Sequence, residues 1–319
     1  MSKRKQHKFL KLIILAAGTA STIYCINRFI SKVSLIKEKL KIDKGSFYNW
    51  KYGNVFYTKK GNGNPLLLIH DCTPYSSSFE WEAIENALSK KYTIYSIDLL
   101  GCGRSDKPAI VYSNFLYVQL INDFIKDVIG EKTSSISNGF SSPLVSMACT
   151  YNSTLFDKLI FVNPTDIDVL HKIPTKRLKI AKAILDLPLI GTLIYHISTN
   201  KENVETLLQE KYFYNPFRVT SNMIETYYES AHHGYGNGKY LLSSIIANYM
   251  NTNIIHGLKS IKNDILIIGG KHQPDIEETI LKYKAANDSI KYIILDKTRS
   301  LPHLEVPKDF LTKVEQFLD

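Results

Sequence analysis

The sequence predicts an α/β fold in which a mostly parallel, doubly wound sheet is interrupted once by a block of helices. An apolar run from Leu66 to Ile69 and a second strand-like segment from Tyr92 to Asp98 flank a stretch with apolar residues at helical spacing, which indicates a strand–helix–strand unit with a right-handed crossover. Strand and helix patterns alternate as far as residue 165. The alternation stops over residues 166–258 and resumes with the apolar run at 265–268.

The first 31 residues predict a membrane anchor. Five basic residues lie within residues 3–11, and the 16 residues from Leu12 to Asn27 carry no charge. A bilayer span needs about 20 apolar residues, and flanking Lys and Arg side chains can extend a shorter one. We therefore predict a single-pass anchor over about residues 9–30, with a cytoplasmic N-terminus because the basic cluster precedes the span. A cleaved signal peptide ending near Ala20 and an amphipathic surface helix are the alternatives.

The net charge of +10 is concentrated at this N-terminal end. Residues 1–41 hold ten Lys or Arg and one Glu, so the remaining 278 residues are close to neutral. We interpret residues 32–45 as a basic connector between the anchor and the folded domain. A nucleic-acid-binding domain carries a basic face on the folded surface. The sequence therefore predicts no nucleic-acid partner.

Residues 46–165 predict the first part of the core. Alternating residues over 47–60 predict two antiparallel edge strands before the strand that starts at Leu66. The following helix, from Phe79 to Leu88, has charged residues between its apolar positions. The remaining elements are a helix over 116–128 that ends at Gly130, a weak strand over 133–136, a helix from 144 and a strand over 159–162.

Residues 166–258 predict a helical insert, and residues 259–319 predict the second part of the core. The insert is rich in tyrosine, and its apolar-periodic stretches lie near residues 178–185, 189–197, 223–231 and 241–249. The second part of the core contains strands over 265–268 and 291–295 and helices near 277–283 and 308–318.

Two short segments carry a resemblance to a known family. The segment from Asp98 to Pro108 has the pattern Asp-x-x-Gly-x-Gly-x-Ser-Asp-x-Pro, and the strand at Leu66 runs into His70 and Asp71. These segments resemble the α/β-hydrolase superfamily, in the branch that contains epoxide hydrolases and haloalkane dehalogenases. The resemblance implies the α/β-hydrolase fold, with residues 166–258 as a cap inserted after the sixth strand. The residues that it implies for the oxyanion side of the pocket are His70, Asp71, Cys72 and Phe140, with Asp71 where the family has glycine.

An α/β-hydrolase carries its nucleophile at the centre of a small-x-nucleophile-x-small turn between a strand and a helix. The segment from Ser137 to Ser141 fits this frame with small residues at both flanks, and its centre is Gly139. Glycine has no side chain that can form a covalent intermediate. A shifted frame would make Ser141 the nucleophile, but it places Pro143 at the second tight position. In the simpler interpretation, Ser141 caps the next helix.

The resemblance also places substitutions at the acid and base positions. The acid follows the strand at 265–268, where His272 or Gln273 aligns, and neither can hold a partner imidazole as a buried carboxylate does. The base precedes a retained Glu-x-Pro segment, and the aligned residue is Ser300. His303 lies three residues later and could act as the base only if the loop shifts its register.

The sequence predicts no metal or cofactor. The cysteines form no Cys-x-x-Cys pair; they are Cys25, Cys72, Cys102 and Cys149. His232 and His233 are adjacent, so on a helix their side chains point apart, and no carboxylate has ligand spacing to both.

Two functional hypotheses remain open at this point. In the first, the chain is a membrane-anchored pseudo-hydrolase that lacks the standard triad and binds a small apolar ligand or a protein partner in the cleft beneath the cap. In the second, it is an active, esterase-like serine hydrolase with Ser141 as the nucleophile and His303 or His272 as the base. Covalent labelling of Ser141 distinguishes the two hypotheses.

Overall fold

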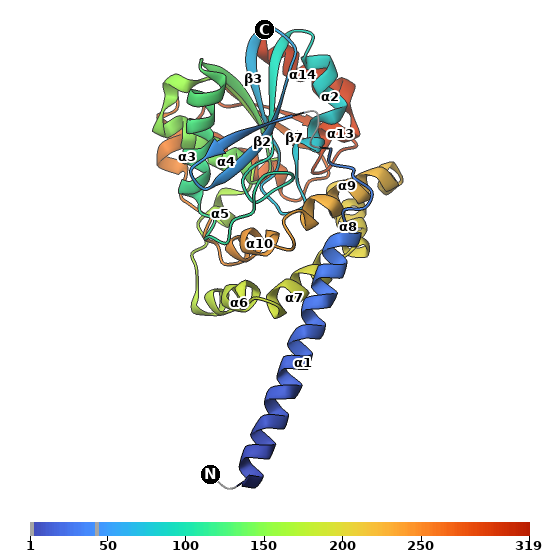
Figure 1. Ribbon diagram of the computed structural model, residues 1–319. Coiled ribbons are helices and arrows are strands. Elements are labelled where there is room, and N and C mark those ends of the chain that lie inside the picture. The colour runs from blue at the N-terminus through green and yellow to red at the C-terminus, as the bar shows by residue number, and fades with distance from the viewer. Residues whose placement is uncertain (1–2, 42–44) are drawn as a thin grey trace.

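The computed structural model describes residues 3–41 and 45–319, and within them the core is one eight-stranded sheet in the order β1-β2-β4-β3-β5-β6-β7-β8 (Figure 1). The β1–β2 and β2–β4 pairs are antiparallel, and the other neighbouring pairs are parallel. The strands are β1 (Ser46–Trp50), β2 (Gly53–Lys60), β3 (Asn64–Ile69), β4 (Tyr92–Ile97), β5 (Thr133–Asn138), β6 (Phe156–Val162), β7 (Ile265–Gly270) and β8 (Lys291–Leu295).

Helices cover both faces of this sheet. Successive side chains of β3 point to opposite faces, so Leu67 and Ile69 belong to one apolar cluster whereas Leu66 and Leu68 belong to another. The first cluster includes side chains of α3 (Asn114–Phe124), α4 (Ser141–Tyr151), α11 (Ile255–Ser260) and α12 (Ile276–Ala286). The second includes side chains of α2 (Glu82–Leu88) and α14 (Pro307–Leu318). The prediction of a mostly parallel, doubly wound sheet is confirmed.

The loop that follows β4 is held by charge and by hydrogen bonds. Asp98 has no exposed surface, and its carboxylate accepts hydrogen bonds from the backbone N of Ser78 at 2.7 Å and from Nε of Arg104 at 2.7 Å. Gly103 has a φ of 46°, and a Cβ at this position would overlap the Asp98 carboxylate. The glycine and the arginine of the pattern that runs from Asp98 to Pro108 therefore serve the folding of this loop.

A run of helices lies between β6 and β7, as the sequence predicts, and it lies below the sheet in Figure 1. Four of these helices match the apolar-periodic stretches of the insert. The α-helices between the two strands are α5 (Ile167–Leu170), α6 (Lys176–Asp186), α7 (Ile190–Ser198), α8 (Lys201–Leu207), α9 (Ser221–His232), α10 (Gly238–Ile246) and α11.

Several boundaries differ from the sequence predictions. The segment predicted as one helix from Phe79 to Leu88 is a 3-10 turn, Ser78–Trp81, followed by α2. This turn buries Glu80 completely, although the helical pattern places its charge on a solvated face. Strand β5 extends two residues beyond the predicted strand, to Asn138, and a short helix, α13 (Pro302–Glu305), precedes α14.

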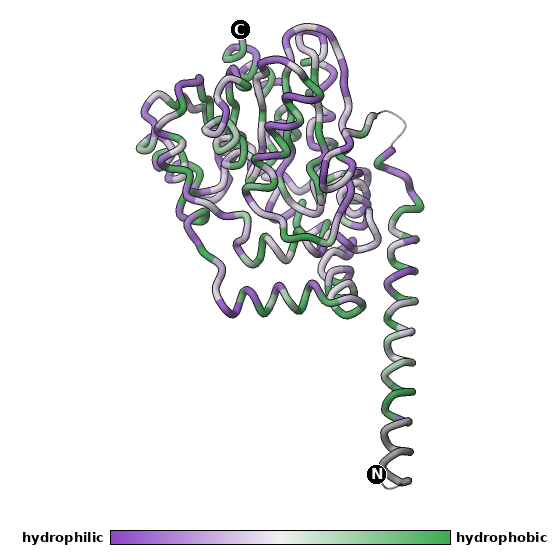
Figure 2. The backbone as a smooth tube through the Cα atoms, turned by 60° about the vertical axis from the view of Figure 1, so that its left-hand side comes forward, coloured by the Kyte–Doolittle hydropathy of each residue, from purple (hydrophilic) through white to green (hydrophobic). Residues whose placement is uncertain are grey.

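Helix α1 (Lys3–Val33) extends away from the rest of the chain (Figures 1 and 2). Within the described residues, its stretch Lys11–Val33 is by itself long and apolar enough to cross a membrane, and a signal sequence near an N-terminus has the same features. Asn27 and Ser31 are buried against the helical insert, so the last turns of α1 are part of the folded body. The predicted connector begins inside this helix, and its residues 42–44 lie outside the described part of the chain.

Candidate functional site

A sharp turn joins β5 to α4 at the position predicted for the nucleophile. Gly139 directly follows the strand and has a φ of 55°, and α4 begins two residues later, at Ser141. This strand–turn–helix arrangement is that of a nucleophile elbow, which presents its central side chain at the top of the sheet. A Cβ at Gly139 would overlap the carboxylate of Asp71. The turn therefore has the backbone shape of an elbow, but Asp71 fills the space that a nucleophile would need.

The carboxylate of Asp71 is held in that space by backbone donors. Its Oδ1 accepts a hydrogen bond from the backbone N of Phe140 at 2.8 Å, and the backbone N–H of Cys72 also stabilises the ionised carboxylate. In an α/β-hydrolase, the N–H of the residue after the nucleophile is one of the oxyanion-hole donors. The corresponding N–H of Phe140 is already bound here, and the negative charge of Asp71 opposes the development of an oxyanion beside it.

A second carboxyl group, that of Glu80, lies next to Asp71. Its Oε2 accepts hydrogen bonds from the backbone N of Asp71 and from Nδ2 of Asn138, both at 3.1 Å. Burial raises the pKa of Asp71 to about 6. Burial and the neighbouring charge of Asp71 raise the pKa of Glu80 to about 8. At neutral pH Glu80 therefore holds a proton while Asp71 is ionised.

His70 and Cys72 flank Asp71 in the chain and are both buried. The backbone N of Leu99 donates to Nε2 of His70 at 3.0 Å, so Nδ1 carries the proton and donates to the carbonyl oxygen of Asp71 at 2.7 Å. Burial lowers the pKa of His70 to about 4. The imidazole is therefore neutral, and it fixes the corner that carries Asp71.

The positions predicted for the acid and the base lie in contact with each other. The hydroxyl of Ser300 donates to Oε1 of Gln273 at 2.7 Å. Ser300 also lies within hydrogen-bond distance of the carbonyl oxygen of Lys211, at 3.0 Å. A histidine and a carboxylate at these positions would form the charged pair of a triad. The pair present is uncharged.

These positions share one cavity of about 420 Å³ between the end of the sheet and the insert. Gly139, Gln273 and Ser300 line it together with Asp71, Cys72 and Phe140. Two residues of the insert that contribute to its wall are Val169 and Ile245. The structure thus brings together the three triad-equivalent positions and three of the four residues predicted for the oxyanion side.

The alternative catalytic residues lie apart from one another, and none of them is among the residues that line this cavity. Ser141 has no exposed surface, and its hydroxyl donates to the carbonyl oxygen of His70 at 2.6 Å. His272 is exposed and stacks on Tyr214, with 4.0 Å between the ring centroids. His303 is fully buried and stacks on Trp81 at 4.4 Å, and burial lowers its pKa to about 3.

Across residues 3–41 and 45–319, no three His, Cys, Asp or Glu side chains are grouped so that they could hold a metal ion. Sequence reasoning missed the participation of Glu80 in the site. The signal that could have located the pair was Asp71, an acid where the family has glycine. Its partner, Glu80, could not be found because the apolar spacing around it is also that of a solvated helix.

No family model matches the chain. An uncharacterized protein of Mycobacterium tuberculosis is 27% identical over 135 residues, which are 41% of this chain and 39% of that protein, so the chain spans about two fifths of the length of the first curated relatives. Proline iminopeptidase of Heyndrickxia coagulans is 22% identical over 82% of this chain and 93% of that enzyme. Soluble epoxide hydrolase of Corynebacterium sp. is 23% identical over 34% of this chain and 37% of that enzyme.

Solved structures match a larger share of the chain. A serine hydrolase involved in carbazole degradation has a TM-score of 0.71 and 19% identity, over 86% of this chain and 98% of that one. A membrane phospholipase A, described as a bacterial virulence factor, has a TM-score of 0.68 and 15% identity, over 98% of both chains. An epoxide hydrolase has a TM-score of 0.69 and 16% identity, over 86% of this chain and 97% of that one. Together with the mostly parallel sheet, these likenesses show that the chain has the α/β-hydrolase fold.

Proposed function

We propose that this chain is a non-hydrolytic binding protein with the α/β-hydrolase fold, which α1 holds at a membrane and which takes a small, largely apolar ligand beneath its cap. One observation carries the proposal. The carboxylate of Asp71 fills the space above Gly139 and accepts the hydrogen bond of the Phe140 backbone N–H. The same carboxylate thus excludes a nucleophile and occupies an oxyanion donor.

The remaining chemistry of the cavity supports this proposal. Acyl transfer needs an activated nucleophile, a base that accepts its proton, and free donors for the oxyanion. Gly139 supplies no nucleophile, and the hydroxyl and amide of Ser300 and Gln273 accept no proton at neutral pH. Loss of triad members in serine proteases leaves about 10³–10⁴-fold catalysis, which comes from binding and the oxyanion hole. Asp71 also reduces this residual catalysis, because it occupies the Phe140 N–H that would serve the oxyanion hole.

The alternative, a serine hydrolase that uses Ser141, gains no support from the position of this residue. Its hydroxyl proton is directed at the carbonyl oxygen of His70, and the side chain is buried at the start of α4. A nucleophilic serine needs an adjacent base within about 3 Å. Neither His272, which is exposed, nor His303, which stacks on Trp81, hydrogen-bonds to it.

The size of the cavity supports a small ligand. A volume of about 420 Å³ falls within the range of small-molecule sites. Apolar side chains of the insert, including Val169 and Ile245, line the cavity together with polar groups from the loops after β7 and β8, including Gln273 and Ser300. We infer a ligand with an apolar body and one hydrogen-bonding end.

The membrane part of the proposal rests on α1. Its stretch Lys11–Val33 has the length and composition of a bilayer span, and the structural likeness to a membrane phospholipase A extends over 98% of this chain, so it includes most of α1. Basic residues lie at both ends of the span, with Lys11 at its start and Arg28 and Lys32 near its end. Such residues are typical of the ends of a membrane helix.

The experiment uses the full chain in detergent micelles with the aryl ester 4-nitrophenyl butyrate as the probe. We expect ligand-detected NMR to show binding while absorbance shows no release of nitrophenol beyond that of a heat-denatured sample. Ile245→Trp should block the cavity and abolish binding, because Ile245 lines it. Ile246→Trp is the matched control, because Ile246 is exposed on the same helix and is not among the lining residues.

A fluorophosphonate probe tests the alternative in the same samples. Labelling and ester turnover that disappear in Ser141→Ala would contradict the proposal and establish Ser141 as a nucleophile. Absence of ester binding to the wild-type chain would contradict the proposed ligand class instead.

A further inference from the structure

The outer face of the cap carries two stripes of exposed apolar side chains. On α6 and the residue that follows it, Ile180, Ile184 and Leu187 lie four and three residues apart, which places them on one side of the helix. On α7 the corresponding residues are Ile190, Ile194 and Ile197. These six side chains are 38% to 61% exposed. A soluble protein rarely exposes a contiguous apolar patch of this kind unless the patch is an interaction surface.

This face is continuous with α1. The turn between α6 and α7, residues 187–190, forms a groove of about 530 Å³ with the side of α1 that runs from Leu12 to Ile23, and the groove is lined almost entirely by apolar side chains. Nδ2 of Asn27 donates to the carbonyl oxygen of Leu189 at 2.9 Å, and Nζ of Lys239 donates to that of Leu187 at 2.7 Å. The turn is therefore fixed beside α1 from two sides.

The length of α1 sets where a bilayer would meet the cap. The hydrocarbon core is about 30 Å thick and needs about 20 helical residues at about 1.5 Å each. Asn27 is where α1 begins its hydrogen bonds to the cap, and the uncharged residues before it, from Leu12 to Ile26, account for about 22 Å at that rise. The remaining thickness of the hydrocarbon core corresponds to the last turns of α1, which pack on α7. A bilayer crossed by α1 therefore reaches the level of the α6–α7 turn.

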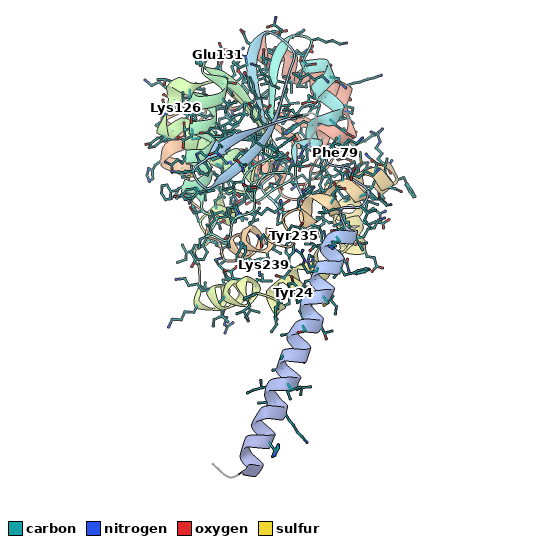
Figure 3. All side chains as sticks on the ribbon, viewed as in Figure 1. Tyr24, Phe79, Lys126, Glu131, Tyr235 and Lys239 are labelled. Carbon is teal, nitrogen blue, oxygen red and sulfur yellow. The ribbon has the colours of Figure 1, made fainter. Side chains whose placement is uncertain are left out.

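The polar residues near this face suit a lipid surface. Over residues 171–199 the only acidic residue is Asp186, and it pairs with Lys182 at 2.7 Å. The exposed cations of α6 are Lys176, Arg177 and Lys179. Such cations attract anionic headgroups. On α1, Tyr24 lies at the height of the cap, close in the view to Tyr235 and Lys239 (Figure 3), and tyrosine is enriched at membrane interfaces.

We propose that α6, α7 and the turn between them form a second membrane contact, in which the apolar stripes lie in the interface of the bilayer that α1 crosses. The contact is with the lipid itself, and anionic headgroups strengthen it through the cations of α6. This inference rests on the proposed membrane anchoring by α1. It adds that the cap lies on the membrane, so that α6 and the helix packed on it, α10, which contributes Ile245 to the cavity, lie between the ligand and the lipid.

The test measures the depth of spin labels on the full chain in vesicles of phosphatidylcholine with and without phosphatidylglycerol. Cys25, the exposed cysteine, is first replaced by serine, and the other three cysteines are buried. Single cysteines are then introduced as Ile194→Cys in α7, Ile14→Cys in α1 and Tyr151→Cys at the end of α4. All three positions are exposed, so labelling leaves the core intact. Electron paramagnetic resonance compares the accessibility of each label to oxygen and to a water-soluble nickel chelate.

We expect the oxygen-to-nickel accessibility ratio at residues 14 and 194 to exceed that at residue 151 severalfold, with a further rise at residue 194 when phosphatidylglycerol is present. A lipid-exposed label at 14 with a water-exposed label at 194 would overturn this inference and leave the anchor intact. Water-exposed labels at both positions would overturn the anchor and this inference together.

Discussion

Asp71 and Asp98 follow two neighbouring parallel strands, β3 and β4, and the charges around them are balanced differently. After β4, Asp98 is paired with the guanidinium of Arg104, with 2.7 Å between Nε and the carboxylate. After β3, Asp71 and Glu80 lie together, and no Lys or Arg in the described part of the chain forms an ion pair with either of them. One site is compensated by a permanent cation, and the other is compensated only by dipoles and by proton uptake.

The pKa values follow this difference. Burial by itself raises the pKa of Asp98, but the charge and hydrogen bonds of Arg104 outweigh it and hold the pKa well below its usual range. Without such a partner, burial raises the pKa of Asp71 to about 6 and that of Glu80 to about 8. The loop of Asp98 and Arg104 therefore stabilises the fold at every physiological pH, whereas the protonation of Asp71 and Glu80 changes within that range. Strongly shifted groups in a cleft are typical of functional sites.

The largest expected effect is on the pH dependence of stability, through Glu80. Its pKa is higher in the folded chain than in the unfolded one, so its stabilising contribution is complete below about 4.5 and is lost as the pH rises through about 8. The loss amounts to at most about 5 kcal/mol in the free energy of unfolding. Glu80→Gln keeps an acceptor oxygen and should remove most of this loss. Urea unfolding at acidic, neutral and alkaline pH measures it, with the exposed Glu202→Gln as the control. If the free energy of unfolding depends on pH equally in Glu80→Gln and the wild type, a group other than Glu80 causes the pH dependence.

The next effect concerns the compensated site. Arg104→Met leaves the ionised carboxylate of Asp98 buried without its partner, and loss of one member of a buried pair costs about 3–5 kcal/mol. Unlike the effect at Glu80, this loss should not change between neutral and alkaline pH. Arg177→Met, on an exposed face of α6, is the control and should leave the unfolding midpoint unchanged. If Arg104→Met lowers the free energy of unfolding by less than about 1 kcal/mol, the Arg104–Asp98 pair contributes no more than an exposed surface ion pair.

The two sites also differ in how far the sequence predicts them. The pattern from Asp98 to Pro108 predicts its own loop, because Asp98, Gly103 and Arg104 meet within a few residues of chain. The frame around Gly139 likewise predicts an elbow, because the geometry of a strand–turn–helix is local. Glu80 instead meets Asn138, 58 residues away, and its burial depends on a 3-10 turn that the apolar spacing does not distinguish from a helix.

Long-range contacts limited the other predictions in the same way. The flanking residues suffice to place Gln273 and Ser300 at the acid and base positions, but their hydrogen bond joins two loops across the end of the sheet. The packing of α1 on the cap joins residues 162 positions apart, Asn27 and Leu189. Hydropathy predicts the span, but it does not predict which of its turns are already occupied by protein contacts.

A smaller effect tests whether Asp71 fills the place of a nucleophile. Gly139→Ala should cost about 2–3 kcal/mol, because the new Cβ overlaps Asp71 and because φ is positive there. In an Asp71→Gly background only the backbone cost of about 1 kcal/mol should remain, which gives a coupling energy of about 1–2 kcal/mol. Gly130→Ala is the matched control, because Gly130 has a φ of 77° and nothing within 4 Å of its Cβ position. Strict additivity of Gly139→Ala and Asp71→Gly would show that Asp71 does not occupy the elbow.

The smallest effect belongs to the uncharged pair in the same cavity. Ser300→Ala removes the hydroxyl that donates to Gln273 at 2.7 Å, and a neutral hydrogen bond contributes about 1 kcal/mol. Because neither side chain titrates, we expect this loss to be the same at acidic and alkaline pH, in contrast to the loss at Glu80. Urea unfolding of Ser300→Ala beside Ser289→Ala, which removes a serine hydroxyl bonded only to the nearby Asn287, measures the difference. If the loss for Ser300→Ala depends on pH, the hydrogen bond between Ser300 and Gln273 is coupled to the charges of Asp71 and Glu80. The cavity would then not divide into a charged side and a neutral side that behave independently.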